Sequence, residues 1–208
     1  MQIELQTSPY KEGKFMENVI ERYKDLEILE SKDLERCRDL YGELMALQKS
    51  KAFMSKESFD LLSFDARKKG YESTQNSSLL LAEEKGMPVG YVFSVVEEVG
   101  DIHGPFPAWA PPKNSENDLG FFPDWENLPP KVGCLSNLYI RNAYRGTGLG
   151  SRLFDLSMKW FETLPEIDLV FIYISNGNDA AFDFYRKKGF TYSHEVFGGF
   201  IKAVYRYI

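Results

Sequence analysis

The sequence contains few cysteines and histidines and no long apolar segment. Two cysteines, Cys37 and Cys134, and two histidines occur among 208 residues. Because the cysteines lie far apart without metal-ligand spacing, we expect two reduced thiols and no metal site. The longest apolar runs, such as residues 169–174, are far shorter than the roughly 20 residues of a membrane helix. The N-terminus is polar and lacks the apolar core of a secretion signal, so a cytoplasmic protein without membrane binding is expected.

The sequence also lacks an excess of positive charge. Its formal net charge is −6 and its pI is about 5.1. A nucleic-acid-binding protein needs a basic face that displaces phosphate counterions, so no nucleic-acid partner is expected. Hydrophobic residues make up 43% and charged residues 27%, as in ordinary globular proteins. The length suits one domain over residues 26–208, preceded by an N-terminal extension over residues 1–25.

Apolar periodicity predicts an α/β protein. The expected strands cover residues 26–30, 78–84, 89–99, 134–140, 168–175, 190–197 and 200–207, and the expected helices cover residues 31–48, 55–69, 148–164 and 179–188. Residues 85–88 form the turn of one predicted hairpin, and Gly198 and Gly199 form that of a C-terminal hairpin. Either Ser31 or Asp33 is expected to cap the first helix.

The segment over residues 100–132 differs from the rest of the chain. It contains seven prolines interleaved with phenylalanine and tryptophan. An insertion this long within a compact domain is usually a lid, a binding loop or an interface, and a surface loop pinned by its own aromatic residues is an equal alternative. An interface would make the protein a homodimer.

A glycine-rich turn joins a predicted strand to a predicted helix. It contains Arg145, Gly146, Thr147, Gly148, Leu149, Gly150 and Ser151. Glycines allow close approach of a ligand to the backbone, and the free N–H groups of a helix N-terminus attract anions. The nucleotide P-loop requires a lysine followed by serine or threonine after its last glycine. The dinucleotide fingerprint requires a third glycine or alanine where Ser151 stands, so both fit poorly. A pyrophosphate site and a turn without a ligand remain open on this motif alone.

A second motif follows the buried strand, and the two together resemble the GNAT superfamily of N-acetyltransferases. The first matches that family's pyrophosphate motif at Arg145, Gly148 and Gly150. The second matches its Asn-x-x-Ala-x-x-Phe-Tyr-x-x-x-Gly-Phe segment, at Asn178, Ala181, Phe184, Tyr185, Gly189 and Phe190. The resemblance implies a mixed, mostly antiparallel central sheet with helices on both faces, in which a parallel pair of strands ends at Ile140 and Ser175.

The resemblance also implies a role for each matched position. Acetyl-CoA, a co-substrate, would lie between the parallel strands, and the N–H of Leu138 would stabilise the oxyanion that develops on the thioester. Tyr185 would protonate the departing thiolate. The residues implied to bind CoA are Leu138, Tyr139, Ile140, Arg145, Gly146, Thr147, Gly148, Leu149, Gly150, Ser151, Asn178 and Tyr185.

Two of these residues also have structural interpretations. Asn178 is a natural N-cap for the helix that starts at Asp179, and its amide can serve both roles. Tyr185 lies one helical turn after Ala181 and fits a core position as well. We favour catalysis for Tyr185 and a combined cap and ligand for Asn178.

The general base is open among several groups. Glu97 and Glu98 end a predicted strand near the expected acceptor, Asp101, His103 and Asp118 lie in the insertion, and a water chain without a dedicated base is an equal alternative. His194 is expected to be a packed or surface residue. Cys134 precedes Leu138 by four strand residues, about 13 Å, so an acyl-cysteine is not expected.

These features predict transfer of an acetyl group from acetyl-CoA to a primary amine, small or peptide-borne, within a ternary complex. One alternative is a non-catalytic acyl-CoA-binding or regulatory module of the same fold. Another is a protein–protein module whose aromatic insertion is a dimer surface.

Overall fold

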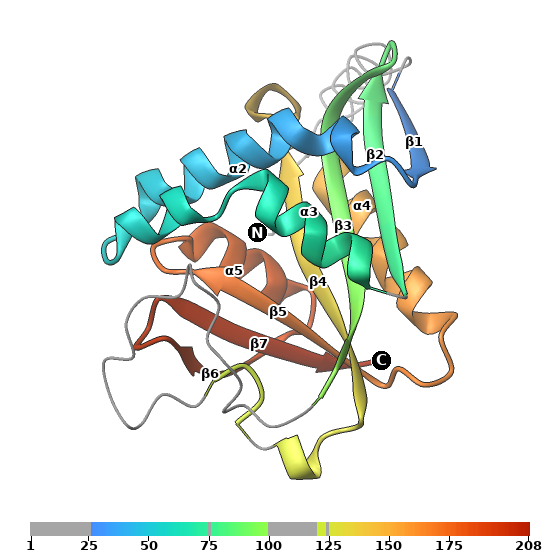
Figure 1. Ribbon diagram of the computed structural model, residues 1–208. Coiled ribbons are helices and arrows are strands. Elements are labelled where there is room, and N and C mark those ends of the chain that lie inside the picture. Colours follow the sequence, from blue (N-terminus) through green and yellow to red (C-terminus); the bar gives the residue numbers. More distant parts are fainter. Residues whose placement is uncertain (1–25, 75, 100–119, 124) are drawn as a thin grey trace, which may run out of the picture.

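The seven strands in the described part of the chain belong to one mixed sheet. The computed structural model describes residues 26–74, 76–99, 120–123 and 125–208, and its sheet has the order β1-β2-β3-β4-β5-β7-β6 (Figure 1). The strands are β1 (Leu26–Ser31), β2 (Ser77–Glu84), β3 (Met87–Glu98), β4 (Lys131–Ile140), β5 (Leu169–Ser175), β6 (Thr191–Val196) and β7 (Ile201–Tyr207). Only β4 and β5 pair in parallel; every other pair is antiparallel. This arrangement confirms the predicted fold class.

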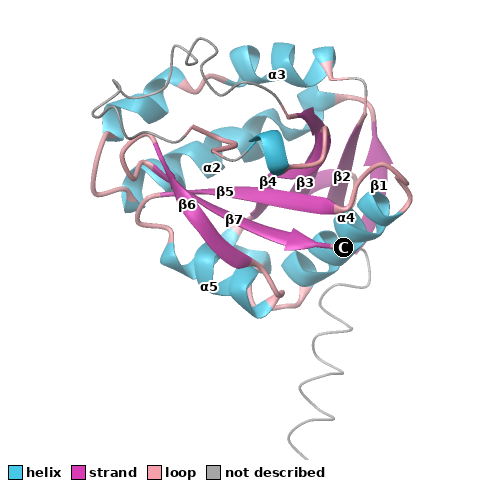
Figure 2. Ribbon diagram, turned by 90° about the horizontal axis from the view of Figure 1, so that it is seen from below, coloured by secondary structure: helices cyan, strands magenta, loops and turns pink. Residues whose placement is uncertain are grey.

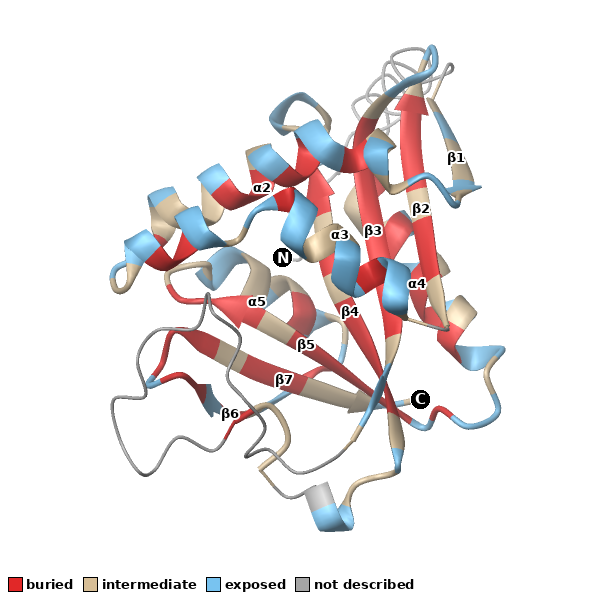
Figure 3. Cartoon of the chain, in the orientation of Figure 1, coloured by how far each residue is buried: buried red, intermediate tan, exposed pale blue. Residues whose placement is uncertain are grey.

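Helices cover both faces of the sheet. Figure 2 shows α2 (Arg38–Lys51) and α3 (Phe64–Ser73) on one face, and α4 (Leu149–Glu162) and α5 (Asp179–Lys187) on the other. The short 3-10 helices are η1 (Leu34–Cys37), η2 (Lys56–Leu61), η3 (Trp125–Asn127) and η4 (Asn142–Tyr144). Each face has its own apolar core, and the helices turn their exposed residues outward (Figure 3). In the described residues, no helix is both long and apolar enough to cross a membrane.

The predicted hairpins and the first helix cap are confirmed. Lys85 and Gly86 connect β2 to β3 with φ angles of 52° and 79°, the positive values of a tight hairpin turn. Gly198 and Gly199 lie between β6 and β7. The side chain of Asp33, rather than Ser31, accepts the capping hydrogen bond, which the Glu35 N–H donates.

The single helix expected over residues 55–69 is wrong. The chain instead forms η2, breaks at Leu62, and restarts as α3, where the Ser63 side chain accepts a hydrogen bond from the Ala66 N–H. The break lets Phe59 pack on Phe200 while Phe64 packs on Tyr41, with ring centroids 5.1 Å and 5.6 Å apart. In one straight helix, residues five positions apart point in different directions, so Phe59 and Phe64 could not both pack into this core. The second part of the segment, α3, also extends to Ser73, beyond the expected end at residue 69.

A bulge in β4 and a gap beside it shape the centre of the sheet. Phe93 pairs with Asn137 and Ser94 with Leu135, so Ser136 is an extra residue on β4. On its other side, β4 pairs with β5 only at Gly133–Val170 and Cys134–Phe171. Beyond these two pairs the strands separate, as expected for the parallel pair.

Candidate active site

The gap between β4 and β5 brings together three residues predicted from the sequence. A cavity of about 50 Å³ at this place is lined by Leu138 of β4 and by Asn178 and Tyr185 of the α5 segment. These residues are up to 47 positions apart in the chain, and the parallel crossover through α4 places them around one cavity. The remaining lining residues are Leu44, Gln48, Leu135, Ser136, Asn137, Ile172, Tyr173, Ile174 and Ala181.

The backbone of β4 directs the Leu138 N–H into this gap. The N–H of Arg141 donates to Val89 O on β3 at 2.9 Å. Because backbone groups alternate along an antiparallel strand, the N–H and C=O of Leu138 then point away from β3. Ile140 follows the same alternation, since its carbonyl oxygen accepts a hydrogen bond from Arg145 Nε at 2.9 Å rather than from β3. The geometry therefore provides the donor position that an oxyanion requires.

Tyr185 is buried on the α4 and α5 side of the gap. Its ring packs against Phe154, Phe184 and Phe190, and only 6% of the residue is exposed. Burial raises the pKa of its hydroxyl above the usual value, because the phenolate would lack water. The hydroxyl consequently stays protonated at neutral pH. Core packing and cavity lining are both present, so the two interpretations of Tyr185 are compatible.

Asn178 begins α5 without capping it through its side chain. Its carbonyl accepts the first helical hydrogen bonds, but the expected side-chain cap is absent. Instead, Lys51 Nζ at the end of α2 donates to Asn178 Oδ1 at 2.8 Å. The amide nitrogen of Asn178 thus remains for a ligand in the gap, and its oxygen ties α5 to α2.

The glycine turn ends as an open helix N-terminus beside Ile140. Gly148 is the N-cap of α4 with φ 87°, a conformation that favours glycine. A Cβ at Gly146 or Gly148 would meet no atom within 4 Å, so the space over the turn is free. Among the described residues, the N–H groups of Gly150 and Ser151 have no hydrogen-bond partner, because the first helical bond is Arg152 N–H to Gly148 O. Such a turn can hold a pyrophosphate.

The other predicted CoA residues surround this turn. Thr147 Oγ1 donates to Tyr144 O and accepts from the Leu149 N–H at 3.4 Å, which closes the turn. The Arg145 guanidinium lies 5.4 Å from the ring centroid of Tyr139. The Tyr139 hydroxyl in turn donates to Glu43 Oε2 of α2 at 3.1 Å. These contacts hold the Arg145 side chain close to the glycine turn.

A larger cavity of about 370 Å³ lies on the α2 and α3 face of the sheet. It shares Gln48, Leu135, Ser136, Asn137 and Tyr173 with the gap, so the two spaces adjoin. Its other lining residues are Met45, Phe59, Leu62, Arg67, Glu97, Phe121, Phe122, Cys134, Ser175, Phe200 and Ile201. A second ligand in this cavity would meet the first near Ser136 and Asn137, which line both spaces.

Of the two candidate glutamates, only Glu97 lines this cavity. Burial raises the pKa of its carboxyl group, and the charge of Arg67 partly opposes that shift. Strand alternation sends Glu98 away from the cavity. Glu97 lies four residues along β3 from the partner of Asn137, about 13 Å, so it could reach an amine only through water. Asp101, His103 and Asp118 lie outside the described residues.

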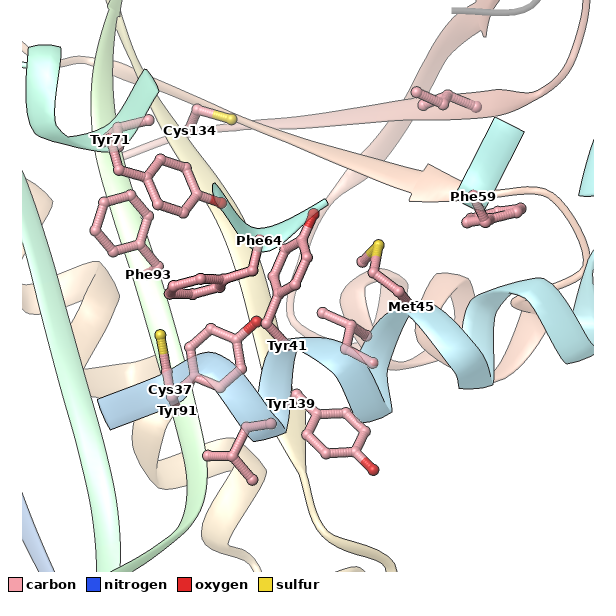
Figure 4. Close-up of a cluster of buried hydrophobic side chains, with 14 of the residues drawn as sticks. Cys37, Tyr41, Met45, Phe59, Phe64, Tyr71, Tyr91, Phe93, Cys134 and Tyr139 are labelled. Atoms are coloured by element: carbon pink, nitrogen blue, oxygen red, sulfur yellow. The ribbon is translucent and has the colours of Figure 1, made fainter. Parts of the chain in front are cut away.

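Two further expectations concern single residues near the cavity. Cys134 is buried in the core with Tyr71 and Phe93 (Figure 4). Burial raises the pKa of its thiol strongly, which makes a thiolate nucleophile unfavourable. His194 is also buried and accepts or donates at both ring nitrogens, to Ser193 Oγ and to Gly120 O. Both residues are therefore structural, as predicted.

Sequence reasoning missed most residues of the larger cavity. Arg67 stands in a basic stretch with Lys68 and Lys69 that is typical of an exposed helix face. Asn137 gave no signal within an apolar strand, although the Tyr71 hydroxyl donates to its Oδ1. Asn176, directly after β5, is fully buried and its Oδ1 accepts from the N–H groups of Phe53 and Met54, but it does not line the cavity.

Comparison with known proteins identifies the family. The profile of the Acetyltransferase (GNAT) family matches residues 38–190, which contain β4, α4, β5, α5 and both predicted motifs. The chain belongs to this acetyltransferase family. Comparison with curated protein sequences finds no match.

Solved structures share the fold at low sequence identity. An acetyltransferase from Streptococcus agalactiae is 14% identical with a TM-score of 0.58, covering 89% of this chain and 99% of that one. The PaiA N-acetyltransferase from Thermoplasma acidophilum, solved with coenzyme A, is 14% identical with a TM-score of 0.58, over 88% and 99% of the chains. NAA60 from Arabidopsis thaliana, solved with acetyl-CoA, is 15% identical with a TM-score of 0.52, over 88% and 98%. At these identities the likeness concerns the fold.

Proposed function

We propose that the protein transfers the acetyl group of acetyl-CoA directly to a primary amine. The observation that carries this proposal is the meeting of Leu138 and Tyr185 in the gap between β4 and β5. A hydrogen-bond donor for an oxyanion and a proton donor for a leaving group are the two functions that thioester aminolysis needs. The two similar structures named as N-acetyltransferase or as an acetyl-CoA complex support the same proposal.

The residues present fit a CoA molecule. Its pyrophosphate would bind the N–H groups of Gly150 and Ser151, with Arg145 adding positive charge. The open space over Gly146 and Gly148 leaves room for it. The amide-containing pantetheine arm would find backbone groups of Leu138 and Ile140 that β5 does not pair. Acetyl-CoA supplies the reaction with an activated acetyl thioester.

Each side chain then has a defined task. The Leu138 N–H donates to the carbonyl oxygen of the thioester as negative charge develops there. Tyr185 gives its proton to the sulfur that leaves, and its protonated state at neutral pH suits this role. The amine approaches from the larger cavity, past Ser136 and Asn137, and must be neutral to react. Its excess proton passes to water or, through water, to Glu97.

The test is a kinetic screen of primary amines with acetyl-CoA, in which release of the CoA thiol is measured. Amine-dependent thiol release is the expected result, with acetylated amine as product by mass spectrometry. Tyr185→Phe serves as the catalytic control. If acetyl-CoA stabilises the protein but no amine causes thiol release, the proposal is overturned in favour of a non-catalytic acyl-CoA-binding module.

A further inference from the structure

The larger cavity has an apolar, aromatic wall. Phe59 and Phe200 form a tilted pair with ring centroids 5.1 Å apart, and Met45 lies beside them. On another side, Phe121 packs edge-to-face on Tyr173 at 4.9 Å, and the Tyr173 hydroxyl donates to Phe121 O at 3.0 Å. At about 370 Å³ the cavity is at the lower end of the roughly 300–1,000 Å³ of small-molecule sites. This wall suits one compact apolar group.

The described residues that line the cavity carry one charge of each sign. Among the described residues that line it, Glu97 is the only carboxylate and Arg67 the only cation. The residue Glu97 is exposed overall, although its carboxyl group loses enough water to raise its pKa, whereas Arg67 is half-buried. Polyamines and aminoglycosides carry several ammonium groups, which would require several carboxylates. Of these two charges, that of Arg67 should therefore act more strongly on a ligand in the cavity.

Arg67 stands close to the place where the amine must react. Its guanidinium lies 5.7 Å from the ring centroid of Tyr71. The hydroxyl of that ring contacts Ser136 Oγ at 2.9 Å and donates to Asn137 Oδ1 at 2.5 Å. One tyrosine ring thus separates Arg67 from the residue before Leu138. An anion held by Arg67 would be near the reacting nitrogen.

A buried hydroxyl adds a polar group to the same cavity. Ser175 at the end of β5 is 7% exposed, and its Oγ has no hydrogen-bond partner within the described structure. A buried hydroxyl without a partner is uncommon, and a ligand in the cavity would satisfy it. The cavity therefore offers a cation and a hydroxyl around an aromatic wall.

We propose that the acceptor is an amino acid with an apolar, preferably aromatic, side chain, whose carboxylate binds Arg67. This inference rests on the proposed function and names the substrate class of the same site. The side chain packs against Phe59 and Phe200. The carboxylate pairs with the guanidinium, which presents a planar pair of donors to it. The amino group then lies toward Asn137 and Leu138.

The test compares four acceptors that separate these features: L-phenylalanine, phenethylamine without the carboxylate, L-alanine without the aromatic ring, and spermidine. We expect L-phenylalanine to give the highest kcat/KM. Arg67→Met keeps the apolar stem of the side chain and removes its charge. It should lower kcat/KM for L-phenylalanine by about 10- to 100-fold, while the value for phenethylamine stays within about twofold. Arg67→Lys should recover part of the loss.

Binding measurements keep the two proposals distinguishable. In the presence of CoA, L-phenylalanine should raise the melting temperature of the parent protein more than that of Arg67→Met. If this difference appears without any acetyl transfer, the proposed function fails and the assignment of the cavity stands. If transfer occurs but spermidine is preferred, or Arg67→Met slows both aromatic amines equally, the amino-acid assignment is refuted. Absence of both transfer and Arg67-dependent binding refutes both.

Discussion

Replacing Tyr185 with phenylalanine removes one hydroxyl group and keeps the aromatic packing. Within the described residues that hydroxyl makes no hydrogen bond, and the ring contacts with Phe154, Phe184 and Phe190 do not involve it. Loss of a hydroxyl without a protein partner should change the free energy of unfolding by less than about 1 kcal/mol. For a chain of this length, that is a shift of roughly 2–4 °C or less in Tm.

Turnover should respond far more than stability. If Tyr185 protonates the leaving thiolate, Tyr185→Phe should lower kcat by about 10²- to 10⁴-fold, the usual effect of general acid catalysis. The Kd for acetyl-CoA should stay nearly constant. Because burial raises the pKa of Tyr185, its titration should not limit the parent rate near neutral pH. The variant should therefore be slower by a similar factor at every pH between about 6 and 9.

Tyr173→Phe is a matched control in the same cavity. The Tyr173 hydroxyl already donates a hydrogen bond to Phe121 O, so Tyr173→Phe should lower the free energy of unfolding by about 1 kcal/mol. It should lower kcat by less than Tyr185→Phe does. Thiol release under saturating acetyl-CoA and amine measures both variants. A fall below threefold for Tyr185→Phe, or an equal fall for both, would show that the Tyr185 hydroxyl is not the acid.

Three further predictions concern the glycine turn, a crowded glycine and the carboxyl group of Glu97. Acetyl-CoA at 100 times its Kd should stabilise the parent protein by about 2.7 kcal/mol, which raises Tm by roughly 5–10 °C. Gly148→Glu should abolish this increase in Tm, because the glutamate side chain would occupy the pyrophosphate position and repel its charge. An increase in Tm that persists in the variant would contradict the pyrophosphate assignment. Gly177→Ala should lower Tm by more than Gly86→Ala. Both glycines have a positive φ, but a Cβ at Gly177 would lie 2.0 Å from Lys51 O, whereas a Cβ at Gly86 would meet no atom within 4 Å. Equal decreases in Tm would show that the backbone contact at Gly177 is unimportant. Burial raises the pKa of the Glu97 carboxyl group, so this group keeps its proton to a higher pH in the folded state than in the unfolded chain. The free energy of unfolding should therefore fall as pH rises from the ordinary carboxyl pKa of ~4.3 to the raised pKa of the folded state. Glu97→Gln should raise Tm more at pH 7 than at pH 4, and a difference that does not depend on pH would refute the pKa shift.

The sequence predicted the strands of the sheet and the position of the glycine turn well, because both depend on local patterns. Alternation and turn residues located the hairpins at Gly86 and at Gly198, and the glycine turn preceded an amphipathic helix as expected. The larger cavity was not predictable in this way. Arg67, Asn137 and Ser175 lie on three separate elements, and only the packing of α3 over the bulge at Ser136 brings them together.

The break between η2 and α3 shows the same limit at a smaller scale. Helical propensity over residues 55–69 is ordinary, and no proline or glycine precedes Gly70 in this stretch. The helix breaks because Phe59 and Phe64 have different partners in the core, which is a tertiary effect. The Ser63 cap then makes the restart favourable.

The separation of β4 from β5 has a consequence for amide hydrogen exchange. Along four consecutive residues of the chain, every second N–H is locked to β3, as the bond from Arg141 to Val89 shows, while those of Leu138 and Ile140 face the gap. Neighbouring amides in one buried strand should therefore exchange with deuterium at alternately slow and fast rates, in a pattern unlike that of a fraying strand. A molecule that fills the gap with amides of its own would act as an additional strand. Its binding would slow the exchange of the Leu138 and Ile140 amides to the rates of their neighbours, without any change in the protein's secondary structure.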